Sequence, residues 1–153
     1  MKYIYGLKKS GLSIIKYLSN NNLSFIAWDD DKKKRKSISL MYKKIIFEHP
    51  NNLDYSKIEE AYITPGIGFN SENLSKLREN NILLYRDLEL YSRLISKQKI
   101  IAVTGTNGKS TTTKLISDLI QSNNHSCFMG GNIGQPLVDF ENLSPHLLRH
   151  SFA

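Results

Sequence analysis

The sequence predicts an α/β protein built on a doubly wound parallel sheet, and three observations lead to that prediction. Short apolar runs typical of strands alternate with stretches whose apolar residues recur at helical spacing, as in successive βαβ units. The pattern restarts near residue 96, which predicts a first domain over 1–95 and the start of a second over 96–140. With 153 residues, 40% of them apolar and 23% charged, the chain can form a packed core.

The elements of the first domain are expected in alternating order. Strands are expected at 2–5, 24–28, 45–47, 61–63 and 82–84. Helices are expected at about 10–19, from Ser71 to about Asn80, and from the capping residue Asp87 through Leu94. The run Lys32–Lys36 directly follows three aspartates and is interpreted as a solvated loop or a first helical turn.

The second domain begins with Lys99–Val103, the most continuous β-branched run of the chain, which is typical of a central parallel strand. A helix over about 110–121 and a strand over 125–129 follow. We therefore expect about two strands and one helix after residue 98. So few elements are too small for a separate core, which becomes plausible at roughly 40–50 ordered residues. The chain is interpreted as a truncated two-domain protein.

Composition limits the classes of function. The net charge of +7 comes from lysines spread over the whole chain, so nucleic-acid binding is the weaker interpretation. No apolar run approaches the roughly 18–20 residues that cross a bilayer, so no membrane association is expected. The single cysteine, Cys127, excludes an internal disulfide. These features favour a soluble protein of a reducing compartment, most simply the cytoplasm. A monomer is expected.

A glycine-rich loop stands between the strand at 99–103 and the helix that follows, which is the context of a phosphate-binding loop. Its glycines would turn backbone N–H groups toward phosphate, its lysine would add positive charge, and Ser110 could ligate Mg²⁺. The loop is shorter than the strict Walker pattern because Val103 stands where that pattern has glycine. The residues expected to contact ATP are Gly105, Thr106, Asn107, Gly108, Lys109, Ser110 and Thr111. A small phosphate-loop NTPase of another family is an alternative.

Four segments together resemble the Mur ligase family. Gly-Thr-Asn-Gly-Lys-Ser-Thr at 105–111 is similar to the ATP loop of these ligases and of their folylpolyglutamate synthetase relatives. Thr-Pro-Gly-Ile at 64–67, Arg-Asp-Leu-Glu-Leu-Tyr at 86–91 and Gly-Gly-Asn-Ile-Gly at 130–134 resemble segments of the branch that adds D-glutamate. The resemblance covers residues 1–140 in order.

The resemblance implies an ATP-dependent ligase of peptidoglycan synthesis. ATP would phosphorylate the carboxylate of UDP-N-acetylmuramoyl-L-alanine, and the amine of D-glutamate would attack the acyl phosphate. Lys109 and Mg²⁺ would stabilise the transferring phosphoryl group. Asn132 would contact the muramoyl substrate near the reacting carboxylate. We therefore expect Lys109 and Asn132 to be the catalytic residues, with ATP and Mg²⁺ as cofactors.

The UDP end of that substrate is expected in the first domain, where a glycine loop follows the first strand and opens a helix. The resemblance places the uracil at Asp29, although Asp30 and Asp31 depart from the family pattern, as does Lys8 in place of the middle glycine. Instead of binding substrate, the three aspartates could equally form a solvated turn. Residues 64–66 could likewise be only a tight turn after a strand. The residues expected to bind the UDP-muramoyl substrate are Gly6, Lys9, Ser10, Gly11, Asp29, Thr64, Pro65, Gly66 and Asn132.

Several parts of the family pattern do not occur after Phe140, among them a glutamate that supplies a Mg²⁺ ligand and the domain that closes on D-glutamate. We therefore expect no turnover from these residues alone, and a non-catalytic nucleotide-binding remnant is an alternative.

The tail 141–153 is atypical. His146 and Arg149 resemble the His-x-x-Arg box of tyrosine recombinases, but no tyrosine nucleophile or other recombinase box accompanies them. Recombinase activity is rejected, and a fusion or sequence junction is preferred.

Overall fold

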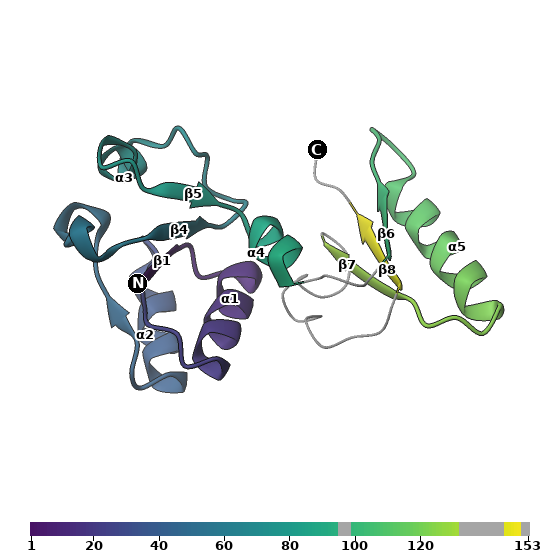
Figure 1. Cartoon of the computed structure of the whole chain (residues 1–153), viewed down its shortest axis with the longest axis horizontal. Coiled ribbons are helices and arrows are strands. Elements are labelled where there is room, and N and C mark those ends of the chain that lie inside the picture. The colour runs from purple at the N-terminus through teal and green to yellow at the C-terminus, as the bar shows by residue number, and fades with distance from the viewer. Residues whose placement is uncertain (95–98, 132–145, 151–153) are drawn as a thin grey trace. The chain divides into compact units, whose positions relative to one another are not determined.

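The computed structural model describes residues 1–94, 99–131 and 146–150, and the chain divides into two compact units (Figure 1). The first unit is Met1–Leu90 and the second is Tyr91–Ala153. Each unit contains its own parallel sheet, which confirms the predicted α/β fold class.

The first unit is a five-stranded parallel sheet in the order β3-β2-β1-β4-β5. Its strands are β1 Lys2–Tyr5, β2 Phe25–Trp28, β3 Ile46–Phe47, β4 Glu60–Ile63 and β5 Leu83–Tyr85. Its α-helices are α1 Lys9–Asn20, α2 Lys32–Met41 and α3 Ser75–Glu79, and α4 Asp87–Leu94 begins in it. Short 3-10 turns are η1 Pro50–Asn52, η2 Tyr55–Lys57 and η3 Glu72–Leu74. All five strands lie within two residues of their predicted positions.

The core of this unit lies on both faces of the two central strands. Every residue of β4 is buried, as are Tyr3, Ile4 and Tyr5 of β1. Because side chains alternate along a strand, Tyr3 and Tyr5 share one face, where they pack in a cluster with Leu74 and Leu77. Ile4 faces the other side, and α1 packs against β1. Parallel strands covered on both faces require such continuous apolar runs.

One helix of this unit confirms the helical-turn alternative for Lys32–Lys36, and another differs from the prediction. The lysine-rich run is the start of a full helix, α2, because the Asp31 carboxylate accepts a hydrogen bond from the Lys33 N–H (2.8 Å) and caps it. The helix expected from Ser71 to Asn80 is divided into η3 and α3. Leu74 of η3 and Leu77 of α3 are both buried in the core.

Among the described residues after 98, the second unit forms a three-stranded parallel sheet in the order β6-β8-β7, with α5 packed on it. Its elements are β6 Lys99–Val103, α5 Lys109–Ser122, β7 Phe128–Gly131 and β8 His146–His150. The expectation of two strands after residue 98 is therefore wrong, because part of the tail forms β8. In the ladder, Lys99 is opposite His146 and Phe128 is opposite Leu147.

The position expected for β6 is also wrong. In the sheet of the described residues this strand is at an edge, and the exposed fractions of Ile100 and Ile101 are 46% and 39%. A run of β-branched residues indicates a preference for strand geometry, but the burial of those residues depends on what covers the strand.

Among the described helices, none has the length and apolarity needed to cross a bilayer.

Candidate functional site

The turn after β1 is a glycine position that no other residue could occupy without strain. Gly6 has a φ of +101°, in the region that L side chains rarely adopt. A Cβ built on Gly6 would lie 1.9 Å from the Thr64 Oγ1. The Gly6 N–H donates to the Trp28 carbonyl (2.7 Å), which continues the ladder between β1 and β2. The backbone therefore turns sharply after β1, and this turn lies against Thr64, the residue that follows β4.

Gly11 brings α1 against this turn. A Cβ built on Gly11 would lie 1.9 Å from the carbonyl oxygen of Gly6, so the first turn of the helix passes at backbone contact distance over the end of β1. This is the close helix–strand approach that the last glycine of a dinucleotide-binding turn provides. Gly6 and Gly11 therefore shape the loop through space and backbone geometry.

The N-terminus of α1 has the properties of an anion site. Lys8 is its N-cap residue, and no side chain caps the helix there. Lys9 and Ser10 form its first turn, and both Lys8 and Lys9 are exposed. The helix dipole and the lysines combine to favour a negative group in front of this end. The Lys8 Nζ lies 3.7 Å from the position that a Cβ on Gly66 would take, so this side chain extends to the turn after β4.

Asp29 follows β2, and its carboxylate holds the same loop from the other side. Its Oδ2 accepts from the Leu7 N–H (2.7 Å) and its Oδ1 from the Asp31 N–H (2.9 Å), with Lys34 Nζ at 3.4 Å. Burial acts to raise the pKa of Asp29, but the two N–H groups and Lys34 outweigh it and hold the pKa below its usual value. The carboxylate is thus ionised and already engaged by the backbone.

Asp30 and Asp31 also have defined partners. The Asp30 carboxylate accepts from the Tyr5 hydroxyl (2.7 Å), from Trp28 Nε1 (3.0 Å) and, more weakly, from Asn73 Nδ2 (3.5 Å). Burial, followed by the hydrogen bond to Asp30, raises the pKa of Tyr5. Asp31 caps α2. Asp29 is buried, whereas Asp30 and Asp31 are exposed, so a solvated turn describes the second and third aspartates but not the first.

The aromatic group beside Asp30 could not be predicted from the sequence. The Arg35 guanidinium lies 3.9 Å over the Trp28 ring, and His49 meets that ring edge-on at a centroid distance of 5.1 Å. Arg35 also donates to the Asp29 carbonyl. The contact between Trp28 and His49 joins positions 21 residues apart, so only tertiary structure reveals it.

The turn after β4 is held by Arg86, the first residue of the family-like segment at 86–91, for which the sequence predicted no role. Thr64 is buried, and its N–H donates to the Tyr5 carbonyl (3.0 Å). The Arg86 guanidinium donates to the carbonyls of Thr64 (2.7 Å), Ile67 (2.8 Å) and Ile63 (3.1 Å) and lies over the Phe69 ring at 4.0 Å. Pro65 and Gly66, between these anchors, are exposed.

These groups meet at one edge of the sheet. The Gly6 turn follows β1, Asp29 follows β2 and Thr64 follows β4, and these three strands are neighbours in the sheet. From β1 the chain continues to β2 on one side, whereas β4 and β5 lie on the other side of β1. In open α/β sheets this reversal of strand order, at the carboxyl ends of the strands, is where ligands bind. The structure therefore brings together the predicted residues Gly6, Lys9, Ser10, Gly11, Asp29, Thr64, Pro65 and Gly66 around that edge.

The loop between β6 and α5 has the backbone of a phosphate loop. Gly105 and Gly108 have φ values of +147° and +74°. Gly108 is the N-cap of α5, again with no side-chain cap, and the helix begins at Lys109, one residue before the predicted start. Left-handed glycines before an uncapped helix orient N–H groups toward the loop's interior.

Lys109 closes this loop on itself. Its Nζ donates to the carbonyls of Gly105 and Thr106, the latter at 3.1 Å, so the ammonium lies across the loop. The helix behind it is tied by the Thr113 hydroxyl, which donates to the Lys109 carbonyl (2.8 Å). Thr106, Asn107, Ser110 and Thr111 are exposed around the loop, and the predicted residue Asn132 lies outside the described residues.

The residues of this loop fit a nucleotide phosphate and a single Mg²⁺ contact. An uncapped helix end with a lysine beside it suits phosphate oxygens. Magnesium usually takes only one or two protein ligands and completes its shell with phosphate and water, so one hydroxyl such as that of Ser110 is sufficient. Within the described ranges no group of three histidine, cysteine or acidic side chains could hold a metal ion without such help.

Fold and loops together define a class: an α/β protein with a dinucleotide-type glycine turn in one unit and a phosphate-type loop in the next. Comparison with known proteins identifies the family within that class. The chain is 38% identical over 143 residues to the UDP-N-acetylmuramoylalanine–D-glutamate ligase of Wolbachia sp. subsp. Brugia malayi (strain TRS), covering 90% of this chain and 29% of the relative. It is 33% identical over 140 residues to the ligase of the same name from Legionella pneumophila (strain Lens), covering 89% and 31%.

A solved structure agrees on the fold. The UDP-N-acetylmuramate:L-alanyl-gamma-D-glutamyl-meso-diaminopimelate ligase from Neisseria meningitides matches with a TM-score of 0.57 and 17% identity, over 97% of this chain and 51% of that one. No protein-family model matches the chain. The chain therefore belongs to the Mur ligase family and corresponds to the N-terminal region of its D-glutamate-adding members. It spans about 30% of the length of the curated relatives that it matches.

Proposed function

We propose that this chain provides the UDP-sugar and ATP-phosphate contacts of an ATP-dependent ligase that adds D-glutamate to UDP-N-acetylmuramoyl-L-alanine in the cytoplasm. The observation that carries the proposal is the loop Gly105–Lys109, whose left-handed glycines and lysine precede an uncapped helix. It occurs in a chain that is 38% identical to a ligase named for this reaction.

In the first unit, the diphosphate of the UDP-muramoyl substrate would face the N-terminus of α1. Lys9 and Ser10 of its first turn would meet the phosphate oxygens, and Gly6 and Gly11 allow the backbone to approach. Thr64, Pro65 and Gly66 would form the opposite wall, held by Arg86. Asp29 already bonds to the Leu7 N–H, so we propose that it supports the loop, with its free acceptor capacity directed to the uracil.

In the second unit, ATP would place its phosphates in the loop, with Mg²⁺ at the Ser110 hydroxyl. ATP supplies the phosphoryl group that turns the substrate carboxylate into an acyl phosphate, which the amine of D-glutamate can attack. Lys109 would exchange its bonds to the Gly105 and Thr106 carbonyls for phosphate oxygens. Its charge would then stabilise the negative charge that develops during transfer. Asn132 is proposed to contact the muramoyl group.

We propose that the 153 residues alone bind these ligands, as a monomer, without turnover. The chain spans 29% and 31% of two ligases named for the reaction, and acyl transfer requires both reactants to be held in one geometry. A second candidate is a nucleotide-binding protein with no role in ligation, for which the loop Gly105–Lys109 alone would be sufficient.

The experiment measures binding and turnover on the purified chain. Calorimetric titration with UDP-N-acetylmuramoyl-L-alanine and with a non-hydrolysable ATP analogue plus Mg²⁺ should show one site for each. Lys9→Ala should weaken only the first and Lys109→Ala only the second. The matched controls are Lys16→Ala and Lys114→Ala, exposed lysines farther along α1 and α5. Selective binding of the ATP analogue with no UDP-sugar binding would favour the second candidate. Absence of both would overturn the proposal.

Turnover is measured as ADP release with both substrates present. No release above the Lys109→Ala background is expected. Release that depends on both substrates would contradict the proposed lack of turnover, while release that needs no muramoyl substrate would indicate an NTPase of another kind.

A further inference from the structure

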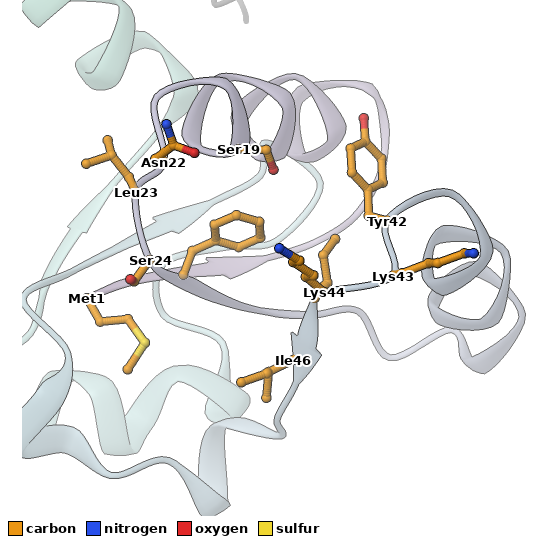
Figure 2. A pocket seen from close by; sticks show the side chains of 11 residues that line it. Met1, Ser19, Asn22, Leu23, Ser24, Tyr42, Lys43, Lys44 and Ile46 are labelled. Atoms are coloured by element: carbon orange, nitrogen blue, oxygen red, sulfur yellow. The ribbon is translucent and has the colours of Figure 1, made fainter.

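A concave site lies at the amino ends of the strands of the first unit's sheet. Figure 2 shows the side chains that line it. It is a cavity of about 630 Å³ between the start of β2 and the segment that joins α2 to β3. This volume is within the range of small-molecule sites, roughly 300–1,000 Å³. Its walls come from the amino ends of the strands, whereas Asp29 and Thr64 stand at their carboxyl ends, so the two sites do not overlap.

The walls of the cavity are held by backbone hydrogen bonds. On one side, the Asn22 N–H donates to the Ser19 carbonyl (3.2 Å) and the Leu23 N–H to the Leu18 carbonyl (2.9 Å). On the other, the Ile45 N–H donates to the Tyr42 carbonyl (3.2 Å). Both connections therefore have a defined conformation, and a ligand would meet walls that are already formed.

One part of the lining is apolar and incompletely covered. Leu23 and Ile46 are 42% and 59% exposed, and Phe25 and Ile45 beside them are half-buried. Large apolar side chains gathered around a hollow, rather than scattered singly, are typical of a binding site. The body of a ligand here would be hydrocarbon.

The charged part of the lining is exclusively positive. Lys43 and Lys44 line the cavity and no acidic residue does. Neither ammonium forms an ion pair with any described residue. In Figure 2 the Lys44 ammonium extends into the group of lining side chains, whereas that of Lys43 extends away from it. An anionic group next to the hydrocarbon would pair with Lys44.

We propose that this cavity binds an amphipathic carboxylate, a hydrocarbon chain or ring with one acidic head. The head pairs with Lys44, and the body lies against Leu23, Phe25 and Ile46. The charge complementarity selects an anion, and the apolar wall selects against small hydrophilic anions such as phosphate. This site is independent of the proposed ligase sites, since it shares no residue with them.

Amide NMR spectra of the full chain, titrated with decanoate, test the proposal. Saturable shifts confined to residues 19–25 and 42–46 are expected. Lys44→Ala should weaken binding about tenfold, while Lys43→Ala should change it less than twofold. Ile46→Asp, at an exposed position, should also weaken it by placing a negative charge on the wall. Decanol should bind more weakly than decanoate, and decyltrimethylammonium should not bind.

The proposal would be overturned by the absence of saturable shifts at these residues, by equal effects of the Lys43 and Lys44 variants, or by equal binding of decanol and decanoate. Inorganic phosphate producing the same shifts would also contradict it, because that would indicate a simple anion site. Each variant's spectrum without ligand shows whether it is folded, so loss of binding is not mistaken for loss of structure.

Discussion

Gly11 of α1 stands so close to Gly6 after β1 that a Cβ on it would lie 1.9 Å from the Gly6 carbonyl oxygen. This contact sets the distance between the helix and the strand at the proposed UDP site. Because the neighbour is backbone, it cannot move aside as a flexible side chain could. The two glycines are therefore a single spatial requirement of the loop.

Gly11→Ala should consequently destabilise the first unit. Pushing α1 away from β1 is expected to lower the free energy of unfolding by about 1–3 kcal/mol, as overpacking does, and to weaken UDP-sugar binding. Urea denaturation gives the first quantity and calorimetry the second. Gly68→Ala is the control, because a Cβ there meets nothing within 4 Å. A stable Gly11→Ala variant with unchanged binding would refute this description of the loop.

Asp29 should make stability depend on acid. Burial raises the pKa of its carboxyl, but the N–H groups of Leu7 and Asp31 and the Lys34 ammonium together lower it below the ordinary value. The stabilisation is thus complete above the unfolded-state pKa of about 4 and is lost as the pH falls through the lower folded-state pKa. Denaturation curves between pH 7 and pH 2 measure this loss.

Asp29→Asn should remove about 1–3 kcal/mol of stability at pH 7 by disrupting the bonds to Leu7 and Asp31. The difference between this variant and the unaltered chain should shrink toward low pH. Glu72→Gln, an exposed carboxylate on η3, serves as the control and should shift the curve little. A difference that is constant with pH would mean that the charge of Asp29 is unimportant.

Arg86→Ala should release the turn after β4. Three carbonyls lose a charged donor, and we expect about 2–3 kcal/mol of lost stability together with faster hydrogen exchange at the Ile67 amide, which donates to the Thr64 carbonyl. Exchange at the Glu48 amide, which bonds to Ala27 at the other side of the sheet, is the internal reference. Equal acceleration at both amides would indicate general destabilisation rather than release of this turn.

Much of the first unit could be predicted from sequence because its signals are local. Apolar runs such as residues 61–63 identify buried parallel strands, and Gly6 and Asp87 mark a turn and a helix start by residue type alone. The positions of all five strands and of α1 and α4 follow from these signals. The fold class is confirmed by the structure and by its likeness to a solved ligase.

What sequence could not predict depends on partners distant in the chain. Arg86 meets the Thr64 carbonyl across 22 positions, and Asp29 meets the Leu7 amide across the same separation. In the second unit, β6 resembles a central strand by composition, but the strand paired with it comes 47 positions later, at His146. Helix α5 buries the polar residues Thr113 and Ser117. It exposes Leu115 and Leu119, whereas an amphipathic helix is expected to bury its leucines.

A crystal structure of the chain with a non-hydrolysable ATP analogue and Mg²⁺ would show directly whether the loop after β6 binds the triphosphate. We expect the triphosphate within the loop from Gly105 to Ser110, with the Lys109 ammonium moved from the Gly105 carbonyl to the phosphate oxygens. A loop that keeps its internal bonds and contains no phosphate, while the analogue binds elsewhere on the chain, would contradict the account.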